Sequence, residues 1–306
     1  MLKDVHDKSI KEEGERMVPA FHKGALVYGE HLVRYKSIEP LIKGKTVLDI
    51  ASGSGYGTYM IAGDAAKVFG VEIDQDSLEY SNKNYSRGNI EYKLGSAEKI
   101  PLDDASVDVV VSFETIEHVK NYTVFLKEIR RVIKPGGVAI ISTPNDPEFS
   151  EHNQFHLHEF EYRELKNLLK NYFKNVELLY QSSWYYSALL KQDEIAQEWK
   201  KNIETDNFAP IPNDKALYFL AVCSDTNLSK LPQPLSLGAL SEKFSPRQQE
   251  KLIRDKEEAD RLIEELQTKV TEKHEELQSL YHSRGWRILQ KLYRVEAAIL
   301  KLVRRK

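Results

Sequence analysis

The chain has one cysteine, Cys223, and no long apolar run. A single cysteine cannot form a disulfide within the chain, and such usage is typical of a reducing compartment. No stretch approaches the roughly 20 apolar residues of a membrane span. The first residues, MLKDVHDKSIKEEGER, are charged and lack the apolar core of a secretory signal. We therefore expect a globular, cytoplasmic protein.

Outside the C-terminus, basic residues do not outnumber acidic ones. The 306-residue chain carries a net charge of −3, but residues 284–306 hold eight basic residues and one acid and so carry +7. Residues 1–283 therefore carry −10, which argues against a nucleic-acid partner. In RGWRILQKLYRVEAAILKLVRRK (284–306) the basic residues lie between apolar ones, a pattern typical of a helix in a membrane interface. A helix that binds a partner protein or oligomerises has the same pattern, so both interpretations stay open.

Short β-branched runs alternate with periodic helical stretches over residues 46–143. Helices are predicted at 76–87 and 122–133, and KPGG (134–137) should end the second helix and turn into the next strand. This rhythm predicts a parallel sheet covered on both faces. The predicted strands are TVLDI (46–50), KVFGVEI (67–73), IEYKL (90–94), VDVVVSF (107–113) and VAIIST (138–143).

Further elements follow this unit. A helix is predicted over 159–173, and two more strands over NVELLYQ (175–181) and ALYFLAVCS (216–224). The residues between these two strands, about 183–215, are interpreted as an insertion or lid. They include the aromatic residues Trp184, Tyr185, Tyr186 and Trp199.

The pattern changes again toward the C-terminus. Residues 225–245 are rich in Ser, Pro, Leu and Asn and are interpreted as a linker. Beyond them, nine positions follow alternating steps of four and three: Leu252, Lys256, Ala259, Ile263, Leu266, Val270, Lys273, Leu277 and Leu280. Seven of the nine are apolar, so the seam predicts a coiled coil over 246–283. A single solvated helix packed on the body is the alternative.

The segment VLDIASGSGYG (47–57) places a loop of small residues between the first predicted strand and a helix. Glycines allow positive φ and close approach of the backbone to a ligand, and the N–H groups that begin the helix favour a carboxylate. Glu72 ends the next strand, where an acid can accept hydrogen bonds from both ribose hydroxyls. Thr58 breaks the spacing of the dinucleotide fingerprint G-x-G-x-x-G. Loop and acid together indicate an adenosine-containing ligand.

With three further motifs the chain resembles class I S-adenosylmethionine (SAM) dependent methyltransferases over roughly residues 15–224. Those motifs are VFGVEID, LGSAEKIPLDDASVDVVVSFETIEHV and RRVIKPGGVAIISTP. The resemblance is especially marked to a bacterial group associated with glycan assembly, in which GERxxP, EHLxRY and NxFHxxEF recur; here they are residues 14–19, 30–35 and 153–160. The resemblance implies a Rossmann-like α/β fold, a seven-stranded sheet with an antiparallel last strand, and SAM as the cofactor.

The resemblance also implies a role for each site residue. The implied contacts are Asp49, Ala51, Gly53 and Gly55 for the methionine end of SAM, Glu72 and Ile73 for the ribose, Ser96, Ala97 and Glu98 for the adenine, and Ser112, Phe113 and Glu114 for the methionine and the transfer site. Two residues depart from the family pattern. Ala51 replaces the usual first glycine of the loop, and Ser96 replaces the usual aspartate near the adenine, which puts more weight on its two neighbours.

Methyl transfer to a hydroxyl is an in-line displacement that also needs a base. The candidates are His118, His156, His158 and Glu114, which should all lie at the carboxyl edge of the sheet. We expect only one of the last two histidines to face the pocket, and His156 is favoured. His152 with these two could instead bind a metal, but no matched acidic pair lies beside them and hard cations prefer oxygen ligands. We therefore predict no metal.

These observations favour an O-methyltransferase that acts on a sugar or a cell-surface glycan intermediate. A methyltransferase for a quinone or other small molecule is one alternative, and a SAM-binding scaffold that recruits partners through its coiled coil is another. The coiled coil suggests a homo-oligomer or a glycosyltransferase partner, and residues 284–306 suggest peripheral contact with the inner face of the cell membrane. The expected parts are a helical cap (1–45), a methyltransferase domain (46–224), the linker (225–245), the coiled coil (246–283) and a basic amphipathic tail (284–306).

Overall fold

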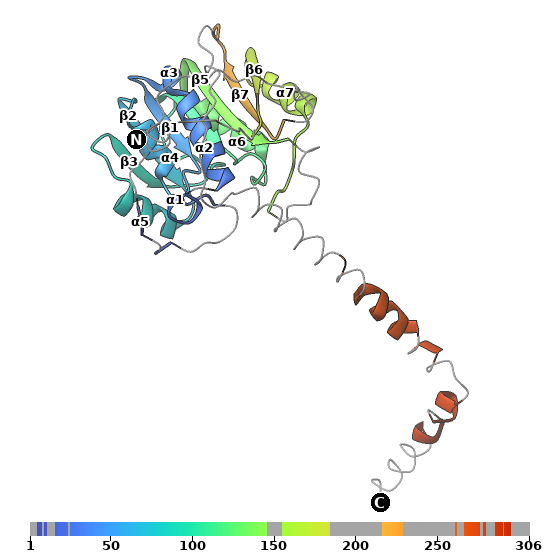
Figure 1. The fold of residues 1–306 in the computed structure, drawn as a ribbon. Coiled ribbons are helices and arrows are strands. Elements are labelled where there is room, and N and C mark those ends of the chain that lie inside the picture. Colours follow the sequence, from blue (N-terminus) through green and yellow to red (C-terminus); the bar gives the residue numbers. More distant parts are fainter. Residues whose placement is uncertain are drawn as a thin grey trace, which may run out of the picture. The chain divides into compact units, whose positions relative to one another are not determined.

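The computed structural model divides into two compact units, residues 1–241 and 242–306. It describes residues 5–7, 9–10, 16–23, 25–145, 155–183, 216–228, 261, 266–275, 278–279, 285–289 and 291–294. The first unit holds a sheet covered by helices, and the second holds the helical stretches near the C-terminus (Figure 1). Each unit is described by itself.

The first unit is built on a seven-stranded sheet with the order β3-β2-β1-β4-β5-β7-β6. Strands β1 to β5 pair in parallel, and β7 is antiparallel to both β5 and β6. The strands are β1 (Thr46–Ile50), β2 (Lys67–Glu72), β3 (Ile90–Leu94), β4 (Val107–Phe113), β5 (Ile133–Pro144), β6 (Asn175–Gln181) and β7 (Tyr218–Ser224). The order reverses between β1 and β4, the point at which open α/β sheets bind their ligands.

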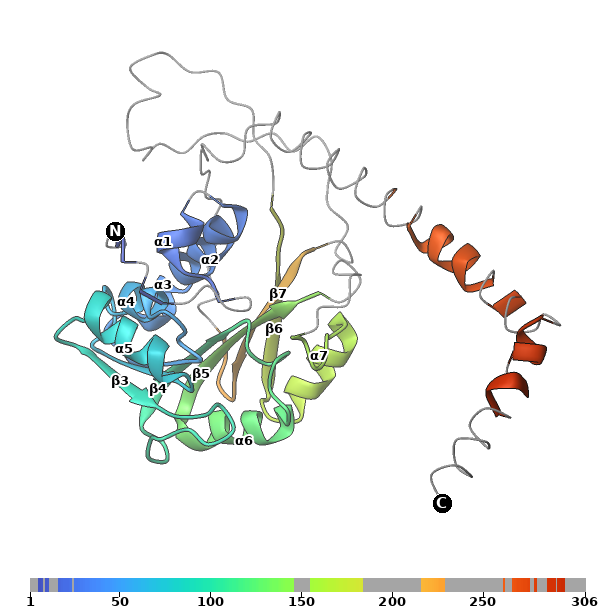
Figure 2. The same ribbon diagram turned by 90° about the horizontal axis from the view of Figure 1, so that it is seen from below.

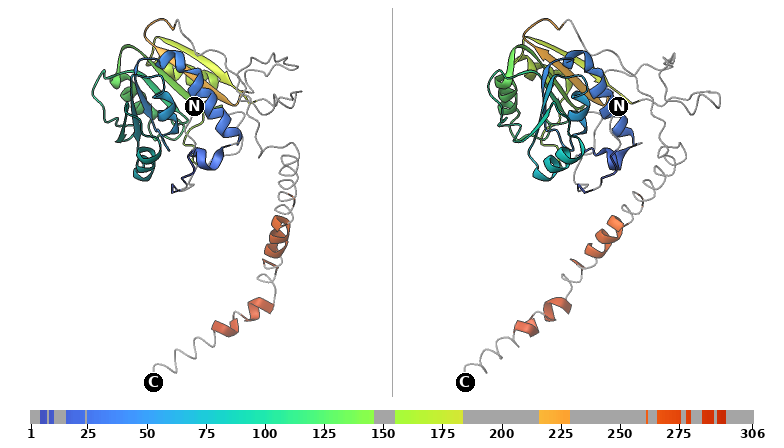
Figure 3. Two further views of the ribbon diagram at one scale, coloured as in Figure 1. Left: turned by 60° about the vertical axis from the view of Figure 1, so that its left-hand side comes forward. Right: turned by 90° about the vertical axis from the view of Figure 1, so that its left-hand side faces the viewer.

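Seven helices accompany the sheet among the described residues of this unit, and they cover it on two sides (Figures 2 and 3). They are α1 (Pro19–His22), α2 (Leu26–Ser37), α3 (Glu39–Ile42), α4 (Tyr56–Ile61), α5 (Gln75–Asn84), α6 (Tyr122–Val132) and α7 (Tyr162–Lys170). Helices α1 to α5 lie on one side of the sheet, and α6 and α7 lie on the other. This is the α/β, Rossmann-like architecture that the sequence predicts.

Alternate residues of the strands pack into two separate hydrophobic cores. Leu48 of β1 belongs to the core that contains Phe125 of α6. Its neighbour Val47 belongs to the other core, together with Tyr35 of α2. Successive side chains of a strand point to opposite faces, so a strand buried on both sides is apolar throughout. Asp49 breaks this rule in β1 and is nevertheless 1% exposed, which marks it as a residue with a role other than packing.

The boundaries differ from the sequence prediction mainly at KPGG (134–137). The prediction that these residues turn before the strand is wrong, because they lie inside β5, which follows α6 directly. Ile133 pairs with Val107, and Val138 pairs with Val109, so the intervening residues form a bulge. Gly136 has a φ of 78° there, which glycine adopts at little cost. The bulge therefore absorbs the Pro-Gly-Gly sequence without ending the strand.

The other predicted elements agree with the structure apart from shifts at their ends. The predicted strand 67–73 ends one residue earlier, at Glu72, and the predicted helices 76–87 and 159–173 correspond to α5 and the shorter α7. Asp74 and Asn121 begin α5 and α6 as N-caps, since each side chain accepts a backbone N–H of the first turn. Residues 184–215, which contain the predicted insertion or lid, lie outside the described residues.

In the second unit the described residues 266–275, 285–289 and 291–294 are helical, with short gaps. Leu266 and Val270, two positions of the heptad seam, are 52% and 68% exposed. Most of the predicted coiled coil and parts of the predicted linker and tail lie outside the described residues, so the coiled coil stays a prediction. No helix in the described ranges is long and apolar enough to cross a membrane.

Candidate functional site

The loop that joins β1 to α4 has an unusual backbone. Ala51, Gly53 and Gly55 have φ values of 59°, 55° and 82°. Positive φ costs a residue with a Cβ about 1 kcal/mol or more, so Ala51 is held by its surroundings. Gly55 is fixed for a second reason, because a Cβ there would lie 2.5 Å from the Oγ of Ser81. The loop therefore turns tightly with small residues and presents its backbone at the carboxyl edge of β1.

Glu72, at the end of β2, holds this loop from the neighbouring strand. Its Oε2 accepts the backbone N–H of Gly53 at 2.8 Å, and its Oε1 accepts that of Asp74 at 3.0 Å. The side chain is 6% exposed. A carboxylate has about four lone-pair sites, so two remain for ligand hydroxyls. The acid predicted to bind the ribose thus lies against the predicted cofactor loop.

Asp49 lies beneath the loop and is buried. Its Oδ2 accepts a hydrogen bond of 2.6 Å from the hydroxyl of Thr58 in α4. The pKa of Asp49 is raised to about 7, mainly by burial; the hydrogen bond from Thr58 opposes this shift and the nearby charge of Glu72 adds to it. The carboxyl group can therefore gain or lose a proton near neutral pH, and a cationic ligand beside it would favour the ionised form.

Ile73, predicted to contact the ribose, and the residues predicted to surround the adenine have varied environments. Ile73 is 71% exposed, although it is large and apolar. Glu98 is engaged within the protein, since its Oε1 accepts the backbone N–H of Asn121 at 2.6 Å and its own N–H contacts the Oγ of Ser96 at 3.2 Å. Ala97 packs against the core on the α6 side of the sheet. The exposed face of Ile73 is thus the apolar surface available to a flat ring.

Ser112 and Phe113 end β4, next to the end of β1. Asp49 pairs with Val111, so these two residues run beside Ile50 and Ala51. Ser112 is fully buried, and its Oγ has no hydrogen-bond partner among the described residues. The Phe113 ring packs edge-on against Tyr35, with ring centroids 4.9 Å apart. The two strand ends therefore form one continuous border.

Two arginines that the sequence analysis did not single out lie at this border. Arg16 forms an ion pair of 3.2 Å with Asp74, and its Cγ is 3.7 Å from a Cβ built on Gly53. Arg34 of α2 is 1% exposed and lies 3.5 Å from the Oε1 of Glu114. Both lie in segments quoted for the family resemblance, GERMVP and EHLVRY. Only that resemblance could have drawn attention to them, since nothing in the local pattern predicts contacts with residues so distant in the chain.

Glu114 follows β4 in a strained backbone conformation, with a φ of 51°. Its Oε1 accepts a hydrogen bond of 2.6 Å from the Oγ of Ser142 in β5, in addition to the ion pair with Arg34. These two contacts, to Arg34 and Ser142, hold the Glu114 carboxyl group in place at the border of the site.

The predicted base histidines separate into a pair and an outlier. The rings of His118 and His156 pack edge-on with centroids 4.9 Å apart. The Nδ1 of His118 is 2.9 Å from the carbonyl oxygen of Phe155, and the Nδ1 of His156 is 2.6 Å from the Oε1 of Glu159. His158 instead bonds to Glu164 through Nε2 at 2.7 Å and packs on Tyr122 and Phe160.

Glu117 is a further buried acid beside this pair, and the sequence analysis did not select it. It is fully buried, and its Oε2 accepts a hydrogen bond of 3.0 Å from the hydroxyl of Thr143. Burial raises the pKa of Glu117 well above its usual value, and the neighbouring Glu114 raises it further. Its position directly before His118 was visible in the sequence, but its complete burial was not.

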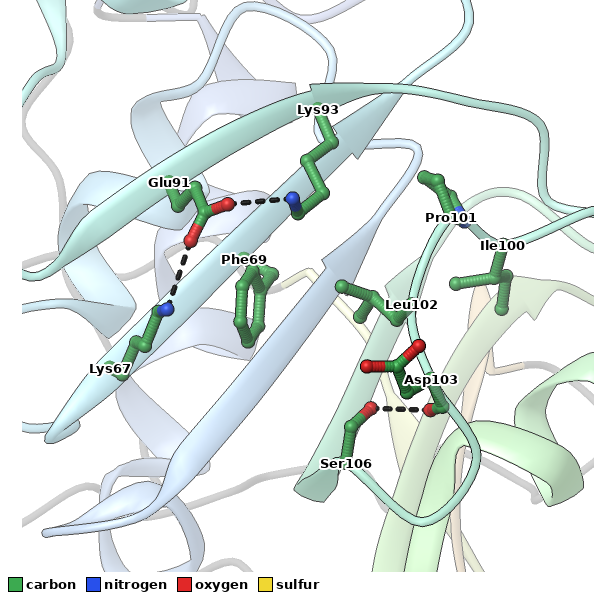
Figure 4. Close-up of a pocket in the computed structure, with 9 residues that line it drawn as sticks. All are labelled: Lys67, Phe69, Glu91, Lys93, Ile100, Pro101, Leu102, Asp103 and Ser106. Atoms are coloured by element: carbon green, nitrogen blue, oxygen red, sulfur yellow. Dashed lines mark hydrogen bonds and ion pairs between the residues drawn. The ribbon is translucent and has the colours of Figure 1, made fainter.

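A surface hollow lies elsewhere on the first unit, over β2 and β3 (Figure 4). Glu91 bridges Lys67 and Lys93 there at 2.9 and 2.6 Å, and the ring of Phe69 lies beneath the lysines. These charged side chains are a third to a half exposed. None of the residues predicted to bind the cofactor or to act as base lines this hollow.

The sequence itself matches a known family over the region that carries the loop. Residues 48–141 match the family described as a methyltransferase domain. A protein of Mycolicibacterium smegmatis named "Probable S-adenosylmethionine-dependent methyltransferase" is 37% identical over 162 residues, which are 51% of this chain and 62% of that protein. The domain belongs to the class I SAM-dependent methyltransferases. This family uses SAM as its cofactor, and the methyltransferase domain here places its loop, Glu72 and Asp49 together.

Two other comparisons extend this result. A protein of Chlorobaculum tepidum named demethylmenaquinone methyltransferase is 34% identical over 131 residues, 42% of this chain and 48% of that protein. A chain from the solved complex of the Haloferax volcanii Trm112 methyltransferase activator has the same fold, with a TM-score of 0.51 and 18% identity, and the match covers 67% of this chain and 94% of that one. This chain thus spans only about half to three fifths of the length of the two curated relatives.

Proposed function

We propose that this protein transfers a methyl group from SAM to a hydroxyl group of a sugar or cell-surface glycan intermediate. One observation carries the proposal: the loop after β1 is tied to Glu72, and a histidine pair follows the neighbouring strands β4 and β5 at the same edge of the sheet. The first feature suits the cofactor and the second suits a base. The preference for a glycan acceptor rests on the sequence resemblance to the glycan-assembly group.

In this proposal the cofactor is held by strand ends and backbone. The remaining lone pairs of Glu72 accept the ribose hydroxyls, and the exposed face of Ile73 packs on the adenine. The methionine end lies over Ala51, Gly53 and Gly55, close to Asp49. Because SAM carries positive charge on its sulfonium and amino groups, the ionised form of Asp49 favours its binding.

The proposed reaction is an in-line displacement at the methyl carbon. His118 is the proposed base, since a hydrogen bond from Nδ1–H to the Phe155 carbonyl leaves the lone pair on Nε2. Its side chain is 32% exposed, so a substrate can reach it. The hydroxyl proton passes to this Nε2 as the oxygen bonds to the methyl group and the methyl–sulfur bond breaks. Glu114, held by Ser142 and Arg34, can accept a hydrogen bond from another hydroxyl group of the substrate that receives the methyl group.

Product analysis with labelled SAM tests this function. The protein is incubated with methyl-labelled SAM and extracted cell-envelope glycans, and the products are identified by mass spectrometry. We expect label in a sugar O-methyl group, and at least a hundredfold slower labelling by His118→Ala, because general bases contribute about 10²–10⁴-fold. Absence of labelled glycan with either protein would count against the glycan acceptor.

A quinone acceptor is the second candidate, and the relative named demethylmenaquinone methyltransferase supports it. The same labelling experiment includes extracted lipid quinones as a parallel sample. Label in the quinone fraction alone would favour this alternative. A chain that binds SAM but labels neither fraction would support a third role, a SAM-binding scaffold that recruits a glycosyltransferase or a second copy through the predicted coiled coil.

We also propose that the C-terminal tail contacts an anionic membrane surface, at the inner face of the cell membrane. The described part of the tail is helical and exposes large apolar side chains between basic ones, and these are Trp286, Ile288, Leu289, Leu292 and Tyr293. Vesicle flotation with anionic lipid tests the proposal. The full chain should float and a chain that ends at Ser283 should not, whereas equal flotation would assign the helix to a protein partner.

A further inference from the structure

Glu117, His118 and His156 bring three metal-binding side chains together at the carboxyl edge of the sheet. One ligand atom from each residue lies within 4.8 Å of the corresponding atoms of the other two. Glu117 and His118 follow β4, and His156 lies beyond β5, so the sheet assembles the group from two separate segments. The metal candidates in the sequence were His152, His156 and His158, with no matched acidic pair beside them; the acid in this group is Glu117, which lies a strand and a helix earlier in the chain.

The carboxylate of Glu117 points an unused oxygen into this group. The residue is fully buried, and its Oε1 has no hydrogen-bond partner among the described residues. The Nε2 of His118 lies 4.0 Å from that oxygen. Buried polar atoms almost always have a partner, because an unmet acceptor costs about 1–3 kcal/mol. This oxygen, beside two imidazoles, is placed where it could accept a cation.

Hydrogen bonds on the far side of each ligand orient it toward the group. His118 and His156 use Nδ1 for the Phe155 carbonyl at 2.9 Å and for the Glu159 carboxylate at 2.6 Å. Donation from Nδ1–H selects the tautomer in which Nε2 carries the lone pair. Glu117 is held through its other oxygen by the Thr143 hydroxyl. Metal-bound histidines are usually oriented by such a carbonyl or carboxylate partner.

The two segments are also joined through their backbones. The carbonyl oxygen of Glu117 accepts the N–H of Leu157 at 2.8 Å and that of His158 at 3.3 Å, and the N–H of His118 bonds to the carbonyl of Thr115 at 3.0 Å. These bonds fix the turn after β4 against the segment that contains His156. The cluster is therefore part of the fold and not a chance approach of mobile side chains.

We propose that Glu117, His118 and His156 bind a divalent transition-metal ion, with two imidazole nitrogens and one carboxylate oxygen on one side and open positions on the other. Two nitrogen donors favour ions such as Zn²⁺, Fe²⁺ or Co²⁺ over Mg²⁺ and Ca²⁺. Ligand atoms with bonds of about 2.1 Å around a tetrahedral ion are about 3.4 Å apart. The 4.0 Å between Glu117 and His118, and the separations of up to 4.8 Å within the group, thus have to shorten by about 0.5–1.5 Å when an ion binds.

The role of the ion in catalysis rests on the proposed methyl transfer, whereas the binding of the ion to these three residues does not. An ion at this position leaves coordination sites for acceptor oxygens. A hydroxyl bound to a cation loses its proton more readily, and that proton passes to water. In the metal-loaded protein the Nε2 lone pair of His118 would coordinate the ion. The ion, and not His118, would then promote loss of the proton from the hydroxyl group.

Titration with Co²⁺ tests the site without reference to any reaction. The protein, made without a histidine tag and stripped with a chelator, is titrated with Co²⁺ and followed by visible absorption, with Zn²⁺ competition as a second readout. We expect one Co²⁺ per chain with the absorption of a site that holds nitrogen ligands. Glu117→Gln and His156→Ala should each weaken Co²⁺ binding at least tenfold. The matched control His158→Ala removes a histidine two residues away and should change the affinity less than twofold.

The affinity of each variant for SAM, measured by calorimetry, shows that the domain is folded. Co²⁺ affinity that is the same in His156→Ala and the unaltered chain would overturn the proposal, as would the absence of the visible absorption in the unaltered chain. The two proposals fail separately. SAM binding and glycan labelling without Co²⁺ binding would refute the metal site alone, whereas Co²⁺ binding at these residues without labelling of any acceptor would refute the proposed function alone.

Discussion

Glu72 accepts the backbone N–H of Gly53 at 2.8 Å, so the acid that ends β2 fastens the loop that follows β1. The acid predicted to bind a ligand therefore also shapes the loop on which that ligand would lie. Its second oxygen holds the N–H of Asp74, the N-cap of α5. A single carboxylate thus links the ends of two parallel strands and the start of a helix at the edge where the cofactor is proposed to bind.

Replacement of Glu72 by Gln should weaken SAM binding roughly tenfold to hundredfold. The amide loses the charge and one acceptor, and hydrogen bonds to charged groups contribute about 1.5–3 kcal/mol. Calorimetric titration with SAM measures the effect. Glu91→Gln is the matched control, because Glu91 lies on the adjacent strand in the hollow of Figure 4 and should leave the affinity unchanged. Equal affinities of the two variants would contradict the assignment of the site.

Asp49 should make the protein less stable as the pH rises from about 4 to 7. Its pKa is about 7 in the folded protein and 3.8 as the reference value, so the folded state binds the proton more tightly. Below pH 3.8 the ionisation of Asp49 does not change the free energy of unfolding. Between pH 3.8 and 7 it lowers this free energy progressively, by about 4 kcal/mol at most, and above pH 7 the loss stays constant. Chemical unfolding from pH 4 to 8 should show Asp49→Asn gaining stability relative to the unaltered chain over this window. A constant difference between the two proteins would refute the shift.

Ile73 should matter for SAM but not for folding. It is 71% exposed, so Ile73→Ala removes little buried surface and should leave the melting temperature of the free protein unchanged. If the Ile73 side chain packs on the adenine, the change to Ala removes about half of the apolar surface that SAM buries there. This loss should cost about 1 kcal/mol of binding free energy, which is about a fivefold weaker affinity. Paired melting and calorimetry measure both effects. Unchanged SAM affinity would show that the adenine lies elsewhere.

Replacement of two glycines on neighbouring helices by alanine should change the stability of the protein in opposite directions. A Cβ at Gly57 would lie 2.1 Å from the ring of Tyr35, which is buried between Tyr56 and Phe113. Such overpacking costs about 1–3 kcal/mol. A Cβ at Gly29, inside α2, meets no atom within 4 Å, so Gly29→Ala should stabilise the protein by about 0.5–1 kcal/mol. Urea unfolding compares the two variants, and destabilisation of equal size by both would contradict the packing.

The buried ion pair of Arg34 and Glu114 should show coupling in a double-mutant cycle. Arg34→Met leaves Glu114 without its cation and should destabilise the protein by about 3 kcal/mol, because an unpaired charge away from water is costly. Glu114→Gln leaves the fully buried guanidinium without its anion. The double variant should therefore lose less stability than the two single variants together. Additive losses, measured by urea unfolding, would show that the two groups do not interact.

The fold could be predicted from the sequence because its signals are local. Runs such as TVLDI and VDVVVSF are mostly apolar, and this indicates burial on both faces of a parallel sheet without knowledge of the partner strands. The bulge at KPGG was missed for the opposite reason. Proline and glycine end most elements, and only the pairing of Ile133 with Val107 keeps these residues in β5.

The loop, the strand end and the acid proposed to bind the cofactor could be found in the sequence because they follow one another within about 25 residues, and the family resemblance implies a role for each. The contacts between distant segments were not. The pairing of Arg34 with Glu114, the packing of His118 on His156 and the unmet oxygen of Glu117 arise where α2 and the segments after β4 and β5 meet. The sequence by itself indicated an adenosine-binding loop, and its family resemblance implied SAM as the ligand. Strand order and burial decided which charges face one another, because only the folded chain removes those groups from water.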